Sequence, residues 1–525
     1  MKNIFAPHST SLRLLVLGTI VMNLIAVCKR DNSHVTPSGR AEAGKITLKP
    51  CIFEAKSGHF NADCGTIIVS ESYDKPDSRL ITLPVIRVHA LNINTGEPVF
   101  YLAGGPGQSN MNFKPPGELL ANHDFVLVGY RGVDGSVRLD CPEVSKAIKG
   151  IGGDLLCAQS LSGLSQAFSR CSDRLQAEGV DLNAYTMIDV IRDLEAARTL
   201  LNYNKIDLLS QSYGTRIAQI YAYQHPEIIH RSVMIGVNPP GRFVWEPDTI
   251  DHQIEYYSKL CALDTECEAC TPDLVRTISS VAHKMPARWL FLPIDPGKVK
   301  VITFALLYHR KTAAMVFDTY FAAEKGDPSG LALMTLAYNF MFPSMITWGD
   351  LASKALSADF DRTRNYADEM DPPNSILGSP FSKLLWSLGD WPTAPIPEDF
   401  RKIQNSNVET LLVSGSIDFA TPAIFATKEL LPALPRGKQV ILSEMGHTGD
   451  LWGVQPQAAV HMLTSFYDTG KADDSMFKYA PMDFGVSWGF PLIAKIAVAV
   501  SLLLILGLLL VLRLAILRIK RRFFN

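Results

Sequence analysis

The 525-residue sequence has few charged residues, and their signs balance. Charged residues make up 19% of the chain, and 50 Lys and Arg against 52 Asp and Glu leave a net charge of −2. A nucleic-acid-binding protein usually carries a basic surface, which this balance does not supply. With 47% apolar residues, the chain also lacks the low hydrophobicity and high net charge of a disordered protein. We therefore expect a folded protein that does not bind nucleic acid.

Other features are scarce as well. The 36 Gly and 32 Pro residues are too few for a collagenous or low-complexity chain. Long apolar runs occur only at the two ends, which excludes a protein with many membrane spans. The sequence contains no Asn-x-Ser/Thr glycosylation site, which favours a bacterial source. What remains is a globular body of one or two domains with a sizeable core.

The N-terminal apolar run is typical of a secretory signal. It covers residues 14–27 after Lys2 and Arg13, which is short for a membrane-spanning helix. We predict a signal peptide or an N-terminal anchor over residues 1–28. The sequence Ile-Ala-Val-Cys at 25–28 also resembles a bacterial lipobox, which would lipidate Cys28, although Val27 stands where that motif has a small residue.

The C-terminal apolar run predicts a transmembrane helix over residues 490–512. Residues 496–512 carry no charge, and Lys495 can extend its amine to the membrane surface. Five Lys and Arg residues follow, so residues 513–525 are predicted to form a basic cytoplasmic tail. The body would then lie on the periplasmic or extracellular side, exported through the N-terminal signal.

Eight of the nine cysteines lie in the body. An even number in an exported chain indicates disulfide bonds, and Cys51 with Cys64 is a plausible local pair. The other six allow many pairings, among which the sequence does not choose. A zinc site at Cys261, Cys267 and Cys270 is the alternative, but no matching His or Cys set lies nearby. We predict neither a metal nor a cofactor.

Short apolar runs alternate with helical stretches along the body. They are typical of buried parallel strands in a doubly wound α/β sheet. The predicted strands are residues 98–102, 125–130, 206–210, 232–237, 410–414 and 439–443. Runs at 65–70 and 80–89 predict an antiparallel start to the sheet.

The stretch between the fourth and fifth of these parallel runs lacks a convincing strand. It shows helical periodicity and clusters of aromatic residues, which we expect to form mostly the core of the helices. We predict a helical lid over residues 241–405, inserted between core segments 45–240 and 406–470.

The motif around Ser212 is the strongest local signal. Residues 210–214 (SQSYG) follow a β-run and precede a helix. They match the nucleophile elbow G-x-S-x-G, with the small residue Ser210 in place of the first Gly. The helix N-terminus would favour negative charge developing beside the Ser212 hydroxyl. The alternative is an ordinary strand-to-helix turn.

A serine nucleophile needs a base, and the base needs an orienting carboxylate. Asp418 follows the run 410–414, and His447 follows the run 439–443. Both therefore lie past the carboxyl ends of strands, in the chain order Ser, Asp, His that this elbow predicts. We predict that Ser212, Asp418 and His447 form a catalytic triad.

An oxyanion hole needs backbone N–H groups that face the attacked carbonyl. Tyr213, directly after the nucleophile, is the first candidate. The glycine-rich loop 103–107 (AGGPG) follows an early strand and offers Gly105 as the second. We exclude a phosphate-binding loop at this position, because the segment lacks the Lys and Ser/Thr of a P-loop and does not match G-x-G-x-x-G.

These motifs resemble those of the proline iminopeptidase and tripeptidyl aminopeptidase family of α/β-hydrolase serine exopeptidases. The resemblance runs over residues 51–467. The matches are residues 103–107 with H-G-G-P-G, 129–136 with D-Q-R-G-x-G-x-S, 212–215 with S-Y-G-G/T, 418–422 with D-x-x-T-P and 446–447 with G-H. Residues 193–198 resemble the family's helix before the nucleophile strand. The chain departs from the family at Ala103, Gly129 and Ser210.

The resemblance implies an α/β-hydrolase fold and hydrolysis of peptide bonds near a free N-terminus. Ser212 would attack the carbonyl, His447 would transfer the proton, and Asp418 would orient His447. The backbone of Gly105 and Tyr213 would hold the oxyanion. A carboxylic ester hydrolase acting on a small acyl substrate is the alternative, because the same triad serves esterases and lipases.

An aminopeptidase must also bind the substrate's ammonium group, for which a carboxylate in a closed pocket is well suited. Glu246, Asp251 and Glu255 near the start of the lid are candidates. A solvated helix face explains them better, so we leave them out of the predicted site.

Overall fold

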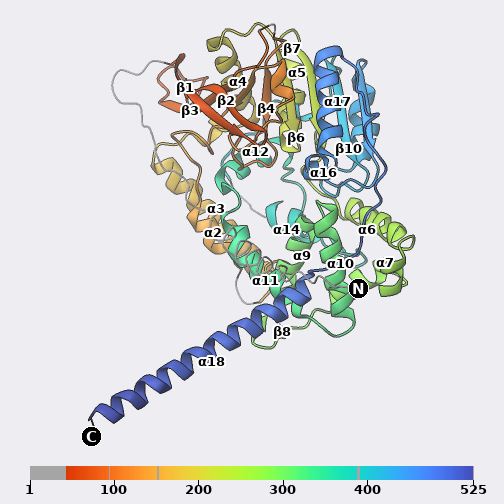
Figure 1. Cartoon of the computed structure of the whole chain (residues 1–525). Helices are drawn as coiled ribbons and strands as arrows, with labels where there is room; N and C mark the ends of the chain where they lie inside the picture. Colours follow the sequence, from red (N-terminus) through yellow and green to blue (C-terminus); the bar gives the residue numbers. More distant parts are fainter. Residues whose placement is uncertain (1–42, 94, 151–152, 387–390, 524–525) are drawn as a thin grey trace, which may run out of the picture. The chain divides into compact units, whose positions relative to one another are not determined.

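The computed structural model describes residues 43–93, 95–150, 153–386 and 391–523. The predicted signal peptide and Cys28 lie outside these ranges. A nine-stranded sheet in the order β1-β2-β3-β5-β4-β6-β7-β10-β11 organises the chain (Figure 1). Its strands are β1 (Lys45–Ala55), β2 (Gly58–Ser70), β3 (Leu80–Val88), β4 (Val99–Leu102), β5 (Phe125–Val128), β6 (Ile206–Gln211), β7 (Ile229–Ile235), β10 (Glu409–Gly415) and β11 (Gly437–Leu442).

The sheet has an antiparallel and a parallel half. β1, β2, β3 and β5 pair antiparallel in succession, and every neighbouring pair from β5 to β11 is parallel. The six predicted parallel strands and the antiparallel start are therefore confirmed. Strand β1 was not predicted, because it is an edge strand whose polar and half-exposed residues give no continuous apolar run. In contrast, β4, β5 and β6 are buried throughout, as expected of strands covered on both faces.

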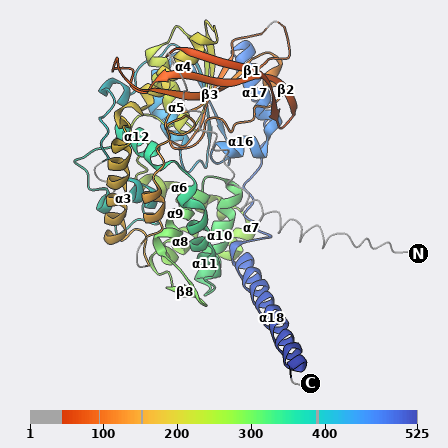
Figure 2. The ribbon, with the colours of Figure 1, turned by 90° about the vertical axis from the view of Figure 1, so that its left-hand side faces the viewer.

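The helices beside the sheet include α4 (Met187–Leu200), α5 (Tyr213–Gln224) and α17 (Pro456–Thr469) (Figure 2). Tyr467 of α17 reaches β6, where its hydroxyl donates to the Leu208 carbonyl over 2.8 Å. Helix α4 begins with a capping box, in which Thr186 and Asp189 satisfy the first free N–H groups. These helices fix β6 in the centre of the sheet, directly before Ser212.

Helices occupy the stretch between β7 and β10, and we call this set of helices the lid. They are α6 (Pro247–Cys261), α7 (Thr265–Cys270), α8 (Leu274–His283), α9 (Pro296–Leu306), α10 (Arg310–Glu324), α11 (Ser329–Met341), α12 (Trp348–Asp359), α13 (Tyr366–Glu369) and α14 (Pro380–Trp386). The only strands described in this stretch are the short pair β8 (Arg288–Trp289) and β9 (Leu292–Pro293). Most of its aromatic side chains are buried, as predicted, but Phe340 is 75% exposed.

Three disulfides cross-link the part of the chain that the structure describes. The bonds are Cys51–Cys64, Cys141–Cys171 and Cys261–Cys267. The predicted Cys51–Cys64 pair is confirmed, whereas Cys157 and Cys270 are free. The zinc alternative at residues 261, 267 and 270 is wrong, because two of its three sulfurs are bonded to each other.

The C-terminal helix α18 runs from Phe490 to Phe523. Its segment Phe490–Ile519 is long and apolar enough to cross a membrane. Its first turns pack against the lid helices α10 and α11, and Lys495 pairs with Asp327 at 2.5 Å. The helix continues without interruption through the basic residues after position 512, so this part of the predicted tail is helical as far as Phe523.

Candidate active site

Ser212 lies at a strained turn between β6 and α5. Its φ of 51° and ψ of −120° place a non-glycine residue in a backbone region that side chains rarely adopt. A Cβ on Gly214 would come 2.2 Å from the Leu102 carbonyl oxygen, so the turn requires glycine there. The departure at Ser210 is accommodated, because its hydroxyl donates to the Val233 carbonyl of β7 over 2.9 Å. Ser212 thus has the backbone of a nucleophile elbow.

Asp418 and His447 are in direct contact. His447 Nδ1 lies 2.8 Å from Asp418 Oδ2 and 3.0 Å from Oδ1, and both side chains are buried. The carboxylate also accepts hydrogen bonds from the backbone N–H groups of Ala420 and Thr421 at 2.9 and 2.8 Å. These bonds fix the carboxylate, which in turn orients the imidazole ring.

His447 also lies beside the strand end that contacts Ser212. The Ser212 N–H donates to the Ile235 carbonyl of β7 over 2.8 Å. A Cβ on the next residue, Gly236, would come 2.9 Å from His447 Cε1, so the imidazole packs directly on that backbone. The centroid of the Tyr308 ring lies 5.3 Å from that of the His447 ring. Ser212, Asp418 and His447 therefore all lie just beyond the carboxyl ends of parallel strands, as predicted.

The glycine-rich loop approaches the serine closely. A Cβ on Gly104 would lie 2.9 Å from Ser212 Cβ, so a larger residue would collide with the nucleophile. Gly105 has a φ of 64°, which glycine adopts without strain. Tyr213 is the first residue of α5, where N–H groups have no partner within the helix. The positions of Gly105 and Tyr213 suit an oxyanion hole beside Ser212.

A buried ion pair from the lid holds this loop. Asp350 and Lys354 of α12 have no exposed surface, and their charged groups lie 2.5 Å apart. The second oxygen of Asp350 accepts a hydrogen bond from the Gly107 N–H over 2.9 Å. The Thr347 N–H donates to the Gly107 carbonyl over the same distance. Burial raises the pKa of Asp350, and Lys354 opposes that rise.

This ion pair could not be predicted from the sequence. Its only local signal is an acid and a base spaced by one helical turn, a pattern common on solvated helices. Lys354 also holds a second segment, because its ammonium group donates to the Arg131 carbonyl over 3.2 Å. Arg131 belongs to the second family motif, at residues 129–136.

That motif is tied to the helix before the nucleophile strand. Arg131 forms two hydrogen bonds of 2.6 Å to the Asp193 carboxylate of α4, and both side chains are buried. Two further bonds of 2.6 Å run from Arg131 to the carbonyls of Glu71 and Ala184. The two segments recognised separately in the sequence therefore form one buried ionic cluster.

Replacing Asp193 with Ala should leave Arg131 charged and unpaired in the interior. Breaking a buried pair in this way typically costs about 3–5 kcal/mol of the free energy of unfolding. Chemical denaturation of the detergent-solubilised chain would measure the loss. Glu398→Ala is the matched control, because it breaks the solvent-exposed pair with Lys402 and should leave the unfolding midpoint unchanged. Equal midpoints for the two variants would contradict a structural role for the Arg131–Asp193 pair.

The three acidic residues considered for ammonium binding have other partners or are exposed. Glu246 is engaged by Arg364 at 2.7 and 3.0 Å. Asp251 accepts the Ile376 N–H at 3.0 Å, and Glu255 is exposed on α6. Glu246 and Asp251 therefore hold the lid together.

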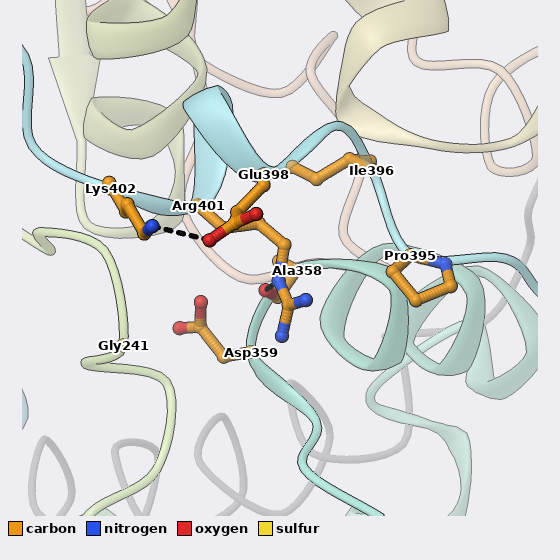
Figure 3. Close-up of a pocket in the computed structure, with 8 residues that line it drawn as sticks. All are labelled: Gly241, Ala358, Asp359, Pro395, Ile396, Glu398, Arg401 and Lys402. Atoms are coloured by element: carbon orange, nitrogen blue, oxygen red, sulfur yellow. Dashed lines mark hydrogen bonds and ion pairs between the residues drawn. The ribbon is translucent and has the colours of Figure 1, made fainter.

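A pocket of about 470 Å³ opens at the junction of the lid and the core (Figure 3). It is lined by Gly241, Ala358, Asp359, Pro395, Ile396, Glu398, Arg401 and Lys402. The Asp359 carboxylate pairs with the buried Arg216 of α5 at 3.1 Å, and Arg401 donates to the Ala358 carbonyl over 2.7 Å. These polar groups connect α12 to neighbouring segments, and the lining includes none of the predicted site residues.

Comparisons with known proteins agree with the sheet and the nucleophile elbow described above. A family model described as "alpha/beta hydrolase fold" matches residues 97–259, and one described as "TAP-like protein" matches residues 378–476. The tripeptidyl aminopeptidase of Streptomyces lividans is 27% identical over 211 residues, which cover 37% of this chain and 38% of that protein. The serine protease Hip1 of Mycobacterium tuberculosis is 28% identical over 199 residues, covering 34% of this chain and 36% of its own length.

The matched stretches thus span well under half of these relatives. Among solved structures, an esterase from Thermogutta terrifontis matches over 77% of this chain and 98% of its own, with 14% identity and a TM-score of 0.37. Sheet, elbow and family models together define an α/β hydrolase. Within that class, the sequence is similar to the tripeptidyl aminopeptidases and to the TAP-like family model.

Proposed function

We propose that this chain is a serine hydrolase, specifically an exported, membrane-tethered aminopeptidase that cleaves peptide bonds near a free N-terminus. The contact between Asp418 and His447, beside the strand end that binds Ser212, is the observation that carries the proposal. The names of the relatives support a peptide substrate. The reaction needs no cofactor.

In this proposal His447 removes the Ser212 proton as the hydroxyl attacks the substrate carbonyl. The N–H groups of Gly105 and Tyr213 stabilise the oxyanion of the tetrahedral intermediate. His447 then protonates the leaving amine, and an acyl-enzyme remains on Ser212. A water molecule, deprotonated by the same imidazole, releases the acyl group.

Export and tethering rest on separate observations. Three disulfides favour an oxidising compartment, and α18 supplies a helix of spanning length. In the proposed arrangement the lid covers residues 241–405 between core segments 45–240 and 406–470. A span over residues 490–512 precedes a cytoplasmic tail at 513–525.

A substrate panel tests the peptidase activity. We expect tripeptidyl and aminoacyl fluorogenic amides with a free N-terminus to be cleaved at least about 10-fold faster, in kcat/KM, than their N-acetylated forms. Short-chain esters with the same fluorophore serve as the comparison, and Ser212→Ala gives the background. Turnover of esters alone would overturn the peptidase proposal and favour an esterase.

A further inference from the structure

The short strands β8 and β9 present two apolar side chains to solvent at their turn. Arg288 pairs with Pro293, and Trp289 pairs with Leu292, which leaves Leu290 and Phe291 as the turn. Leu290 is 59% exposed and Phe291 72% exposed. Two-residue hairpin turns usually contain Asn-Gly or Asp-Gly, which are polar and tolerate positive φ.

The backbone at this turn is strained as well. Leu290 has a φ of 52°, a region that a bulky residue adopts only at a cost. The chain therefore accepts both backbone strain and the exposure of two large apolar side chains at one position. Neither feature stabilises the isolated protein.

Helix α11 extends this apolar surface. Directly after β9, the Asp295 N–H donates to Thr335 Oγ1 of α11 over 3.2 Å. Beyond this contact, α11 exposes Leu336 at 38%, Phe340 at 75% and Met341 at 50%. We call Leu290, Phe291, Leu336, Phe340 and Met341 the lid patch. A cluster of exposed apolar side chains marks an interaction surface more often than a single exposed residue does.

Helix α11, which carries part of the lid patch, also contacts the start of the C-terminal helix. Ser329, in the first turn of α11, donates to the Pro491 carbonyl over 3.3 Å, and Lys495 pairs with Asp327 just before α11. Both ribbon views place β8 on the side of the lid toward which α18 runs (Figures 1 and 2). A bilayer crossed by α18 would therefore meet this side of the lid.

We propose that the lid patch is a second membrane contact, in which Leu290 and Phe291 insert into the surface of the bilayer that α18 spans. The proposal rests on the proposed anchoring by α18. Apolar side chains flanked by cations suit the boundary between lipid headgroups and acyl chains, and exposed Arg288 stands beside the turn. With α18 alone the body could tilt freely, whereas a second contact holds the lid against the lipid.

Depth-dependent quenching of the full-length chain in vesicles tests this contact. The vesicles contain phosphatidylcholine and phosphatidylglycerol, with a spin-labelled lipid as the quencher. An NBD fluorophore is attached to Phe291→Cys after Cys28, Cys157 and Cys270 have been changed to Ser. The matched control label is at Leu263→Cys, an 84% exposed apolar position between α6 and α7. We expect loss of fluorescence at 291 and none at 263.

Co-flotation with vesicles after alkaline washing tests the anchor separately. If the chain floats but the label at 291 is quenched no more than the label at 263, the lid contact is wrong and the anchor stands. If the chain does not float, the anchor fails and the lid contact fails with it. If the turn binds a protein partner instead of lipid, the chain would float, but the label at 291 would be quenched no more than the label at 263.

A double variant separates membrane contact from a structural role. Leu290→Gly with Phe291→Asn places glycine at the first turn position, where φ is positive, and relieves the strain, so the thermal midpoint should stay equal or rise. A label at Phe340→Cys should nevertheless lose quenching in this variant. Unchanged quenching at 340 would overturn the role of the turn, and a lowered midpoint would show that Leu290 and Phe291 are there for stability.

Discussion

Changing Ser212 to Ala should lower kcat by a factor on the order of 10⁶, with the fold unchanged. The reason is that Asp418 and His447 have no other hydroxyl to activate at the elbow in the proposed mechanism. Steady-state kinetics on the best substrate of the panel would measure the loss, and circular dichroism would verify folding.

Ser210→Gly is the matched control for this variant. It removes a hydroxyl two residues away that bonds only to Val233 of β7 in the structure, and it restores the family's glycine. We expect kcat within about 10-fold of the parent chain. If Ser212→Ala keeps more than about 1% of the activity, Ser212 is not the nucleophile.

Changing Asp350 to Ala should produce the second-largest effect, although Asp350 touches no substrate in the proposed mechanism. The Gly107 N–H would lose its acceptor, so the loop that carries Gly105 would no longer be held in place. Losing one oxyanion donor typically costs about 10²–10³ in kcat, and we expect a loss of that order with little change in KM. Lys354 would also be left buried without its partner, which typically costs about 3–5 kcal/mol of stability.

The double variant Asp350→Ala with Lys354→Met separates these two effects. An apolar pair of similar volume removes the unpaired charge, so most of the lost stability should return. The Gly107 N–H still lacks its acceptor, so kcat should remain low. If kcat recovers together with stability, Asp350 does not position the loop, and the Asp350–Lys354 pair has only a structural role.

The positions in the fold that the sequence predicted correctly are those whose signals are local. Ser212, Asp418 and His447 each stand directly after an apolar strand, and parallel strands bring their carboxyl ends to one edge of the sheet. Asp418 and His447 meet as expected, and the loop at Gly104 touches Ser212. Their assignment as a working triad stays a prediction that the kinetic experiments decide.

The features that were missed depend on distant parts of the chain. Asp350 bonds to Gly107 across 243 positions, and no motif marks Asp350, although Gly107 ends the glycine-rich motif at 103–107. The pairing of Cys141 with Cys171, which leaves Cys157 free, follows from how α2 (Pro142–Ala147) packs on α3 (Ala158–Ala177), and Cys270 is free because Cys261 pairs with Cys267. The exposure of Phe340 likewise depends on which face of α11 the lid covers. Spacing along the sequence encodes none of these arrangements.

The most direct test of the central claim is covalent labelling of the full-length chain by a fluorophosphonate, followed by mapping of the adduct by mass spectrometry. Such probes phosphonylate only a serine that an adjacent base activates. The proposed mechanism predicts one adduct, on Ser212, which is absent from Ser212→Ala and strongly slowed in His447→Ala. A folded parent chain that stays unlabelled, or that is labelled at another serine, would contradict it.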